Sequence, residues 1–382
     1  MVIASADTLP MNGQKETDLN KPTSMIKNKI LKRALLIIPI VLIVILIAFS
    51  SFYTYWNTTS PDKTCALCHE IGKSVDSQLQ SSHRNLHCKE CHGTALSDGN
   101  HSLKEKGMMV VNHLKNKKVE NIRLNEDQLL EVLNNCKRCH SSEYVQWNSG
   151  GHSADYQHVF LNTSHNTTEQ ISYDCLRCHG MFFEGSIDQV VEPLSIKGPW
   201  KLKDEKLAKI PVIPCMACHQ IHQAGSPKIK PDYSDPKTIF YKKKGAIANL
   251  GLYDRNEKVY FPIAELPKLN LWDGERKVIV SDDLIMRNCV QCHAPNANHQ
   301  AGTADDRTPR GVHEGLSCMA CHEAHSNNAK NSCLSCHPAI SNCKMDVTKM
   351  NTSYADADSP NNIHFVSCKD CHKIEKRRNQ VN

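Results

Sequence analysis

Aromatic side chains are scarce in this 382-residue chain, where Phe, Trp and Tyr together make up 6% of the residues. The mean hydropathy is −0.47, although that average includes a long apolar segment near the N-terminus. The rest of the chain therefore has little material for an ordinary hydrophobic core. Cysteine and histidine, by contrast, are abundant, with 19 and 21 residues. This composition indicates that metal, rather than side-chain packing, holds the chain together.

The apolar segment covers residues 34–49 and contains no charge or amide. Continued to Phe52 it is long enough for a helix of about 28 Å, which spans a bilayer. Basic residues precede it and aromatic residues follow it: Lys27, Lys29, Lys32 and Arg33, then Phe52, Tyr53, Tyr55 and Trp56. Since positive charge stays inside, we expect a single-pass anchor of the bacterial inner membrane with the C-terminal bulk in the periplasm.

The alternative is a cleaved signal peptide, for which Ala48 and Ser50 form a weak cleavage site. The late position of the basic residues and the length of the apolar run favour an uncleaved anchor. Either interpretation exports the chain.

Eighteen of the 19 cysteines follow one pattern, in which two cysteines enclose two residues and a histidine comes next. The pairs are Cys65 and Cys68, Cys88 and Cys91, Cys136 and Cys139, Cys175 and Cys178, Cys215 and Cys218, Cys289 and Cys292, Cys318 and Cys321, Cys333 and Cys336, and Cys368 and Cys371. The histidines are His69, His92, His140, His179, His219, His293, His322, His337 and His372. On a helical turn these three positions share a face, so two thiols can form thioethers with one haem and the histidine can bind its iron.

Zinc ribbons and disulfides also use closely spaced cysteines, but neither gives a reason for histidine to follow all nine pairs. The pattern therefore predicts nine c-type haems. Cys343 is left over, and we expect a free or buried thiol there rather than a functional one.

Twelve histidines lie outside the motifs, and nine haems need at most nine distal ligands. Ten are candidates: His83, His113, His152, His158, His165, His222, His299, His313, His325 and His364; His87 and His101 are weaker. His222 and His325 each stand three residues after a proximal histidine, so we expect each to reach a neighbouring haem rather than its own. Iron with two histidines only passes electrons, whereas open iron can bind a substrate.

The formal charge of +6 is no argument for nucleic acid as a partner. Nine haems would bring roughly 18 propionates, which many lysines would neutralise. The haems would also supply the missing core. We therefore expect a multihaem cytochrome c fold, mainly α with much irregular structure.

Six regions are expected along the chain. They are a disordered cytoplasmic tail (1–33), the transmembrane anchor (34–56), a dihaem segment (57–125), haems three to five (126–225), a haem-free insert (226–288) and haems six to nine (289–382). The dihaem segment should contain a helix with Met108, Val111, Leu114 and Val119 as its apolar positions. Strand signals at 238–241, 258–261 and 277–280, with a turn at 254–256, predict a β-rich insert. It either covers haem edges or docks a partner.

The segment after the anchor resembles the NapC/NirT group of membrane-anchored quinol dehydrogenases over about 70 residues. The likeness rests on Cys65-Ala-Leu-Cys68-His69-Glu70, on Ser82-His83, and on residues 88–92. The resemblance implies that electrons come from membrane quinol and pass to periplasmic redox partner proteins. Ile71 departs from the group, which often has methionine there, and this puts the ligation of the first haem in question. Lys104 and Lys106 either lie near a quinol head group or form a solvated basic face.

The remaining chain is similar to periplasmic multihaem cytochromes, and the stretch 305–318 shares this likeness without indicating an activity. The sequence favours an electron relay from quinol to periplasmic or outer-surface acceptors. The alternative is a multihaem reductase or oxidase of small nitrogen or sulfur compounds with one open haem. Related enzymes sometimes replace a motif histidine by lysine, and here all nine keep histidine.

Overall fold

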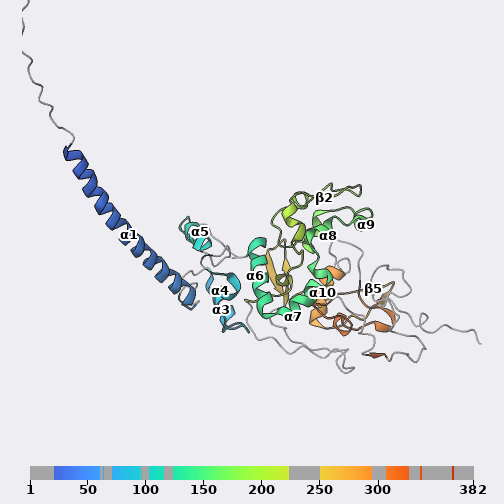
Figure 1. The fold of residues 1–382 in the computed structure, drawn as a ribbon. Coiled ribbons are helices and arrows are strands. Elements are labelled where there is room, and N and C mark those ends of the chain that lie inside the picture. Colours follow the sequence, from blue (N-terminus) through green and yellow to red (C-terminus); the bar gives the residue numbers. More distant parts are fainter. Residues whose placement is uncertain are drawn as a thin grey trace, which may run out of the picture. The chain divides into compact units, whose positions relative to one another are not determined.

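The structure is a computed structural model and describes residues 21–60, 63, 71–94, 96, 103–115, 124–222, 250–294, 307–326, 336–337 and 364, with side chains from residue 31 onward (Figure 1). It divides into two units, Met1–Thr59 and Ser60–Asn382. Several predictions fall outside the described residues: the first and ninth motifs, Cys333, Cys343, His101, His299, Val119 and the strand at 238–241. The finer regional boundaries stay predictions.

The first unit is built around one helix, α1 (Lys21–Thr58), which continues through Pro39. Its part from Leu31 to Thr58 is long and apolar enough to cross a membrane. Near its C-terminal end Phe49 stacks on Tyr53 with ring centres 6.5 Å apart. An apolar N-terminal helix of this kind serves either as a membrane anchor or as a signal sequence.

In the described part of the second unit, helix is the main regular secondary structure, there is little sheet, and most of the helices are short. They are α3 (Gly72–Leu79), α4 (Cys88–His92), α5 (Leu103–Leu114), α6 (Glu126–Cys139), α7 (Ser141–Asn148), η2 (Gly151–Ser153), α8 (Tyr156–Phe160), α9 (Thr163–Asn166), η3 (Tyr173–Arg177), η4 (Ile187–Gln189), η5 (Glu205–Lys209), η6 (Cys215–Ala217), α10 (Leu284–His293), η8 (Gly311–His313) and η9 (Cys318–Ala320). The described strands pair into three antiparallel two-stranded sheets: β1 (Val191–Glu192) with β2 (Lys201–Leu202), β3 (Gly251–Asp254) with β4 (Val259–Pro262), and β5 (Trp272–Asp273) with β6 (Arg276–Lys277).

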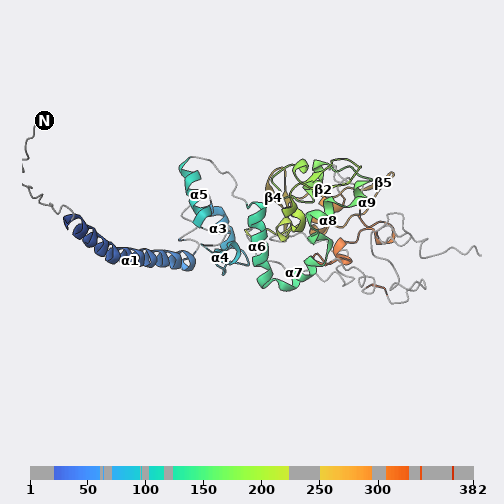
Figure 2. The ribbon, with the colours of Figure 1, turned by 45° about the horizontal axis from the view of Figure 1, so that its top comes forward.

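Helix α6 shows how the sequence fixes a helix that ends in a motif. Asn125 and Gln128 form a capping box at its start, with bonds of 2.9 and 3.1 Å between side-chain oxygens and backbone N–H groups. Its apolar stripe, which includes Leu129 and Val132, is buried. Its last turn packs against α4, where the Asn135 amide donates to the Cys91 carbonyl at 2.9 Å (Figure 2). The second and third motifs are therefore neighbours.

The described part of the predicted insert forms two hairpins. In the first, Asp254 accepts hydrogen bonds from the N–H groups of Asn256 and Glu257 at 2.9 and 2.8 Å, which confirms the predicted turn. In the second, β6 ends at Lys277, so the strand expected at 277–280 is shorter than predicted. The reason is local: the Ile279 N–H bonds the Glu314 carboxylate at 2.7 Å instead of a neighbouring strand.

Buried apolar residues form four small clusters in the described part of the second unit, rather than one large core. The second cluster brings Leu129 of α6 against the β3–β4 hairpin, where Phe182 stacks on Tyr253 with ring centres 4.3 Å apart. Small separate clusters are what a chain poor in aromatic residues can build. Three motif cysteines pack against these clusters: Cys175, Cys218 and Cys318.

Candidate functional site

The motifs whose turns are described form single helical turns. The N–H of the motif histidine donates to the carbonyl of the first cysteine at 2.9 Å for His140, 2.8 Å for His179, 3.0 Å for His219 and 2.9 Å for His322. Such a turn places the two cysteines and the histidine on one face.

The opposite face of these turns is packed into the protein. In the fourth to seventh motifs the residue after the first cysteine is buried: Leu176, Met216, Val290 and Met319. Three of them join apolar clusters, and the cysteines themselves are only half-buried. Packing of the spacer residue therefore fixes each of these turns against the protein.

Among the described residues, six motif histidines face a second histidine from another part of the chain. The pairs, with the distance between ring centres, are His92 with His222 (5.9 Å), His140 with His83 (6.1 Å), His219 with His325 (5.9 Å), His293 with His152 (6.1 Å), His322 with His364 (6.1 Å) and His337 with His313 (6.3 Å). In each pair, the histidine that lies outside the motif is one of the predicted distal candidates. The distances fall in a narrow range although the pairs join unrelated segments.

This spacing fits one iron atom between two imidazoles. An imidazole nitrogen lies about 2.0–2.1 Å from a bound transition metal and about 1.2 Å from its own ring centre, so two rings on opposite sides of one metal have centres about 6.4 Å apart. Within the described residues no group of three or more His, Cys, Asp or Glu side chains could hold a metal ion directly. The arrangement therefore fits a cofactor that brings its own equatorial ligands, as haem does.

The pairs differ in how the two rings are rotated. The interplanar angles are 22°, 20°, 39° and 13° for the pairs of His92, His219, His293 and His322. They are 73° for the pairs of His140 and His337. Four pairs are thus nearer to parallel and two are close to perpendicular.

His222 shows how a distal ring is oriented. Its Nδ1 lies 2.9 Å from the backbone carbonyl of Ser74 on α3. A carbonyl can only accept, so Nδ1 carries the proton, and Nε2 is left to face His92. His83 is held by its backbone instead, since its N–H donates to the Ser81 hydroxyl at 3.1 Å and its carbonyl accepts from the Gln78 amide at 2.7 Å.

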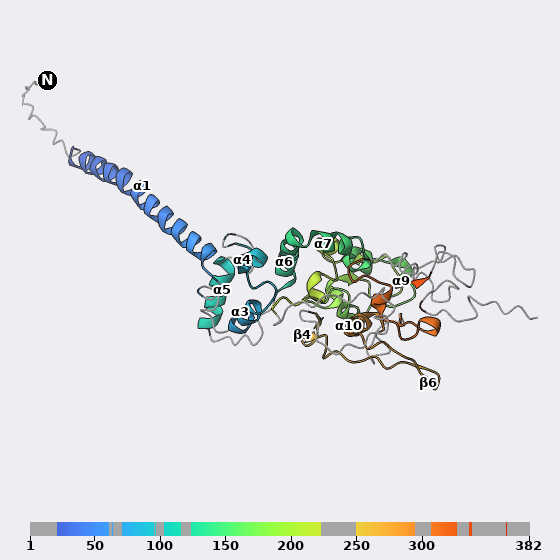
Figure 3. The ribbon, with the colours of Figure 1, turned by 90° about the horizontal axis from the view of Figure 1, so that it is seen from below.

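The sequence predicts that His222 and His325 each reach a neighbouring haem rather than their own. In the structure, each of them lies beside the histidine of another motif. His222 follows the fifth motif and faces the second, and His325 follows the seventh motif and faces the fifth. His152 of η2 lies beside His293, the last residue of α10 (α10 is labelled in Figures 1 and 3). The carbonyl of Ser74 was missed, because a backbone group leaves no signal in a sequence.

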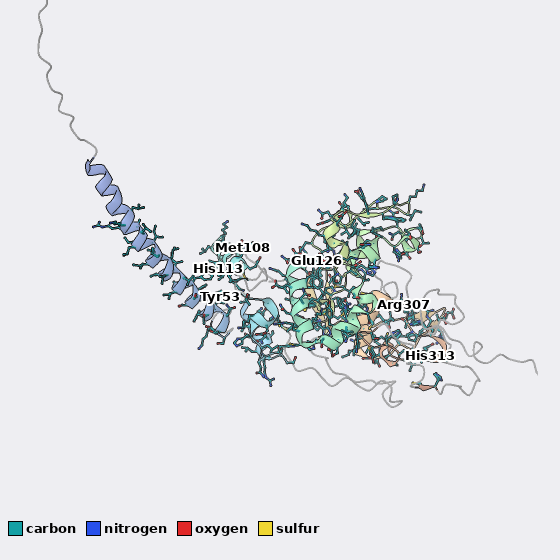
Figure 4. All side chains as sticks on the ribbon, viewed as in Figure 1. Tyr53, Met108, His113, Glu126, Arg307 and His313 are labelled. Carbon is teal, nitrogen blue, oxygen red and sulfur yellow. The ribbon has the colours of Figure 1, made fainter. Side chains whose placement is uncertain are left out.

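Other candidates lie elsewhere. His158 is 70% exposed, and its Nδ1 lies 2.6 Å from a carboxylate oxygen of Asp155. His165 lies 3.6 Å from Glu169 on the surface. His113 is exposed near the C-terminal end of α5, and His87 precedes α4 as its N-cap (Figure 4). For His158, His165 and His87, no ring contact with a motif histidine is found among the described residues.

Burial keeps several of the paired rings neutral. It lowers the pKa of His219 to about 4 and also lowers the pKa values of His152 and His322. Burial and then the charge of His140 lower the pKa of His83. Neutral imidazole is the form that binds iron.

Thiols of different motifs also meet. The thiol of Cys178 raises the pKa of Cys292, and the thiol of Cys318 raises the pKa of Cys289, so the thiols in each of these two pairs lie close together. The fourth, sixth and seventh motifs are therefore adjacent, which their order in the sequence does not indicate.

A family model described as cytochrome c554 and c-prime matches residues 135–195 and 273–323, which contain the third, fourth, sixth and seventh motifs. The match covers less than half of the chain. Comparison with curated proteins and with solved structures found no match. The family match indicates a c-type cytochrome family, and with it c-type haem as the iron cofactor.

Proposed function

We propose that the chain is a membrane-anchored periplasmic cytochrome with nine c-type haems that relays electrons from membrane quinol to periplasmic or outer-surface acceptors. The observation that carries the proposal is the set of six histidine pairs with ring centres 5.9–6.3 Å apart. A haem bound between two such rings supplies one-electron redox chemistry at an iron that has no position left for a substrate.

The chain's own residues have three tasks in this proposal. The cysteine pairs would hold each haem covalently through thioethers, and the histidine that follows would bind its iron. The second histidine of each pair would supply a further ligand to the same iron. The apolar spacer residues, such as Leu176 and Met319, pack into the protein and keep the turn in place.

Contact between motifs supports a relay. The thiol contacts of Cys178 with Cys292 and of Cys289 with Cys318 would bring the edges of three haems close together. The packing of α4 on α6 does the same for the second and third motifs. Electrons then have short steps between neighbouring sites without a mobile carrier.

The membrane and quinol parts of the proposal rest on the sequence. Helix α1 is long and apolar enough for an anchor, and the segment after it resembles the NapC/NirT group. If quinol analogues fail to reduce the membrane-bound protein, the quinol donor is wrong and only a relay remains.

Haem ligation is tested by removing a second histidine. In the purified full-length protein, His222→Ala should convert one haem from low-spin to high-spin iron, because the ring that faces His92 is lost. His158→Ala is the matched control, since His158 is bonded to Asp155 at the surface, and it should leave the spin state unchanged. Low-spin iron throughout His222→Ala would refute the pairing. A high-spin haem in the unaltered protein, together with turnover of nitrite or hydroxylamine, would refute a pure relay.

A further inference from the structure

The turn that carries His313 is bounded by two glycines. Gly311 and Gly315 lie on either side of His313 with φ values of 65° and 87°, in the left-handed region that glycine adopts most readily. Its described backbone bonds close only onto the turn itself, from Glu314 N–H to Gly311 at 3.2 Å and from Leu316 N–H to His313 at 3.1 Å.

A side chain next to His313 attaches this turn to the insert. Both carboxylate oxygens of Glu314 accept from Nη1 of Arg276, at 2.8 and 2.9 Å. The Ile279 N–H donates to the same carboxylate at 2.7 Å. The Glu314 side chain is only 10% exposed, whereas that of Arg276 is 54% exposed.

The other end of the segment is attached to a different histidine pair. The Arg310 N–H donates to the carbonyl of His364 at 2.7 Å, and His364 faces His322. Residues 310–314 are therefore held at one end by the pair of the seventh motif and at the other by the β5–β6 hairpin (Figures 3 and 4).

We propose that Arg276 and Glu314 are positioning residues that hold the His313 ring nearly perpendicular to His337, and so set the electronic state of the eighth haem. This inference rests on the proposed ligation of that haem by His313 and His337. The proposed role of the β5–β6 hairpin is then to fix the rotation of a ligand ring. This role differs from both earlier alternatives, a cover for haem edges and a docking surface for a partner.

The energetics make the effect local. An ion pair with an exposed arginine contributes little to the stability of the whole fold. Loss of Arg276 should therefore leave folding and haem content unchanged. The freed turn can then rotate about its two glycines, and the ring of His313 rotates with it.

The test uses Arg276→Met and Glu314→Ala in the full-length protein, with nine haems verified by pyridine haemochrome. Electron paramagnetic resonance distinguishes perpendicular from parallel ligand planes, since the former give a large maximum g value. We expect one large-g signal to move or broaden in both variants, and the signal from His83 and His140 to stay. Arg276→Lys should restore it in part, because lysine can still donate to Glu314.

Asp273→Asn is the control, since Asp273 is a second and more distant acceptor of Arg276 at 3.4 Å, and its spectrum should match that of the unaltered protein. Unchanged large-g signals in both Arg276→Met and Glu314→Ala would overturn the positioning role. His313→Ala separates the two proposals. If it produces one high-spin haem while the other variants leave the spectrum intact, only positioning is wrong. If it produces none, the ligation by His313 is wrong.

Discussion

The ring angles of the histidine pairs predict a measurable division among the haems. Two pairs have interplanar angles of 73°, and four have angles between 13° and 39°. When the two ligand planes on an iron are perpendicular, its two highest partly filled d orbitals are nearly equal in energy, and the maximum g value is large. Parallel planes separate these orbitals and give a rhombic signal at lower g.

Two substitutions isolate one haem of each kind. His83→Ala removes a ring at 73° to His140, and His325→Ala removes a ring at 20° to His219. The spectrum of the unaltered protein minus that of the variant then contains one low-spin haem. We expect a single large-g signal for His83→Ala and a single rhombic signal for His325→Ala, each integrating to one spin.

Because the measurement is a difference, the haems of the motifs outside the six pairs cancel. Each variant should also gain one high-spin signal of equal intensity. Two rhombic difference signals, or two large-g signals, would refute the link between the described ring angles and the ligation. A difference larger than one spin would show that the sites are not independent.

Three further predictions concern stability. Leu129→Ala, in the buried stripe of α6, should lower the free energy of unfolding by about 2–5 kcal/mol in a denaturant titration, whereas Leu114→Ala on the exposed face of α5 should change it little. Burial raises the pKa of Glu126, so the folded protein binds that proton more tightly than the unfolded chain. Stability should therefore fall as pH rises through the range above the ordinary glutamate pKa; Glu126→Gln should reduce this slope in melting curves. Trp147→Phe leaves a backbone carbonyl without the indole donor, now 3.1 Å away, and should cost about 1–3 kcal/mol in the same titration; no loss would contradict that bond.

The motifs could be predicted from the sequence because they are local. Two cysteines and a histidine within five residues make one helical turn, and nothing distant is needed to form it. The pairing of His83 with His140, or of His152 with His293, depends on how the chain returns to itself, and spacing does not contain that information. His222 and His325 are intermediate cases: their position after a motif indicated a neighbouring site, but not which one.

A local feature of the sequence could have separated His152, which lies beside a motif histidine, from His158, which does not. Asp155 stands three residues before His158 and caps α8, accepting from the His158 N–H at 2.9 Å. A histidine in such a cap has a carboxylate partner of its own, and His152 lacks that context. For helix α5, the periodicity of the sequence correctly predicted a helix with Met108 and Val111 on one face. Both side chains are exposed in the structure, so periodicity predicted the helix but not the burial of its apolar face.

The pairing of His92 with His222 has a consequence for how the protein is made. A chain is synthesised from its N-terminus, so the second motif is made well before the ring that faces it. The same delay separates His219 from His325 and His322 from His364. Maturation must therefore keep early sites open until later segments arrive. Because early motifs pair with histidines from later segments, a chain truncated near its C-terminus would lack the second histidine at some of the earlier motifs.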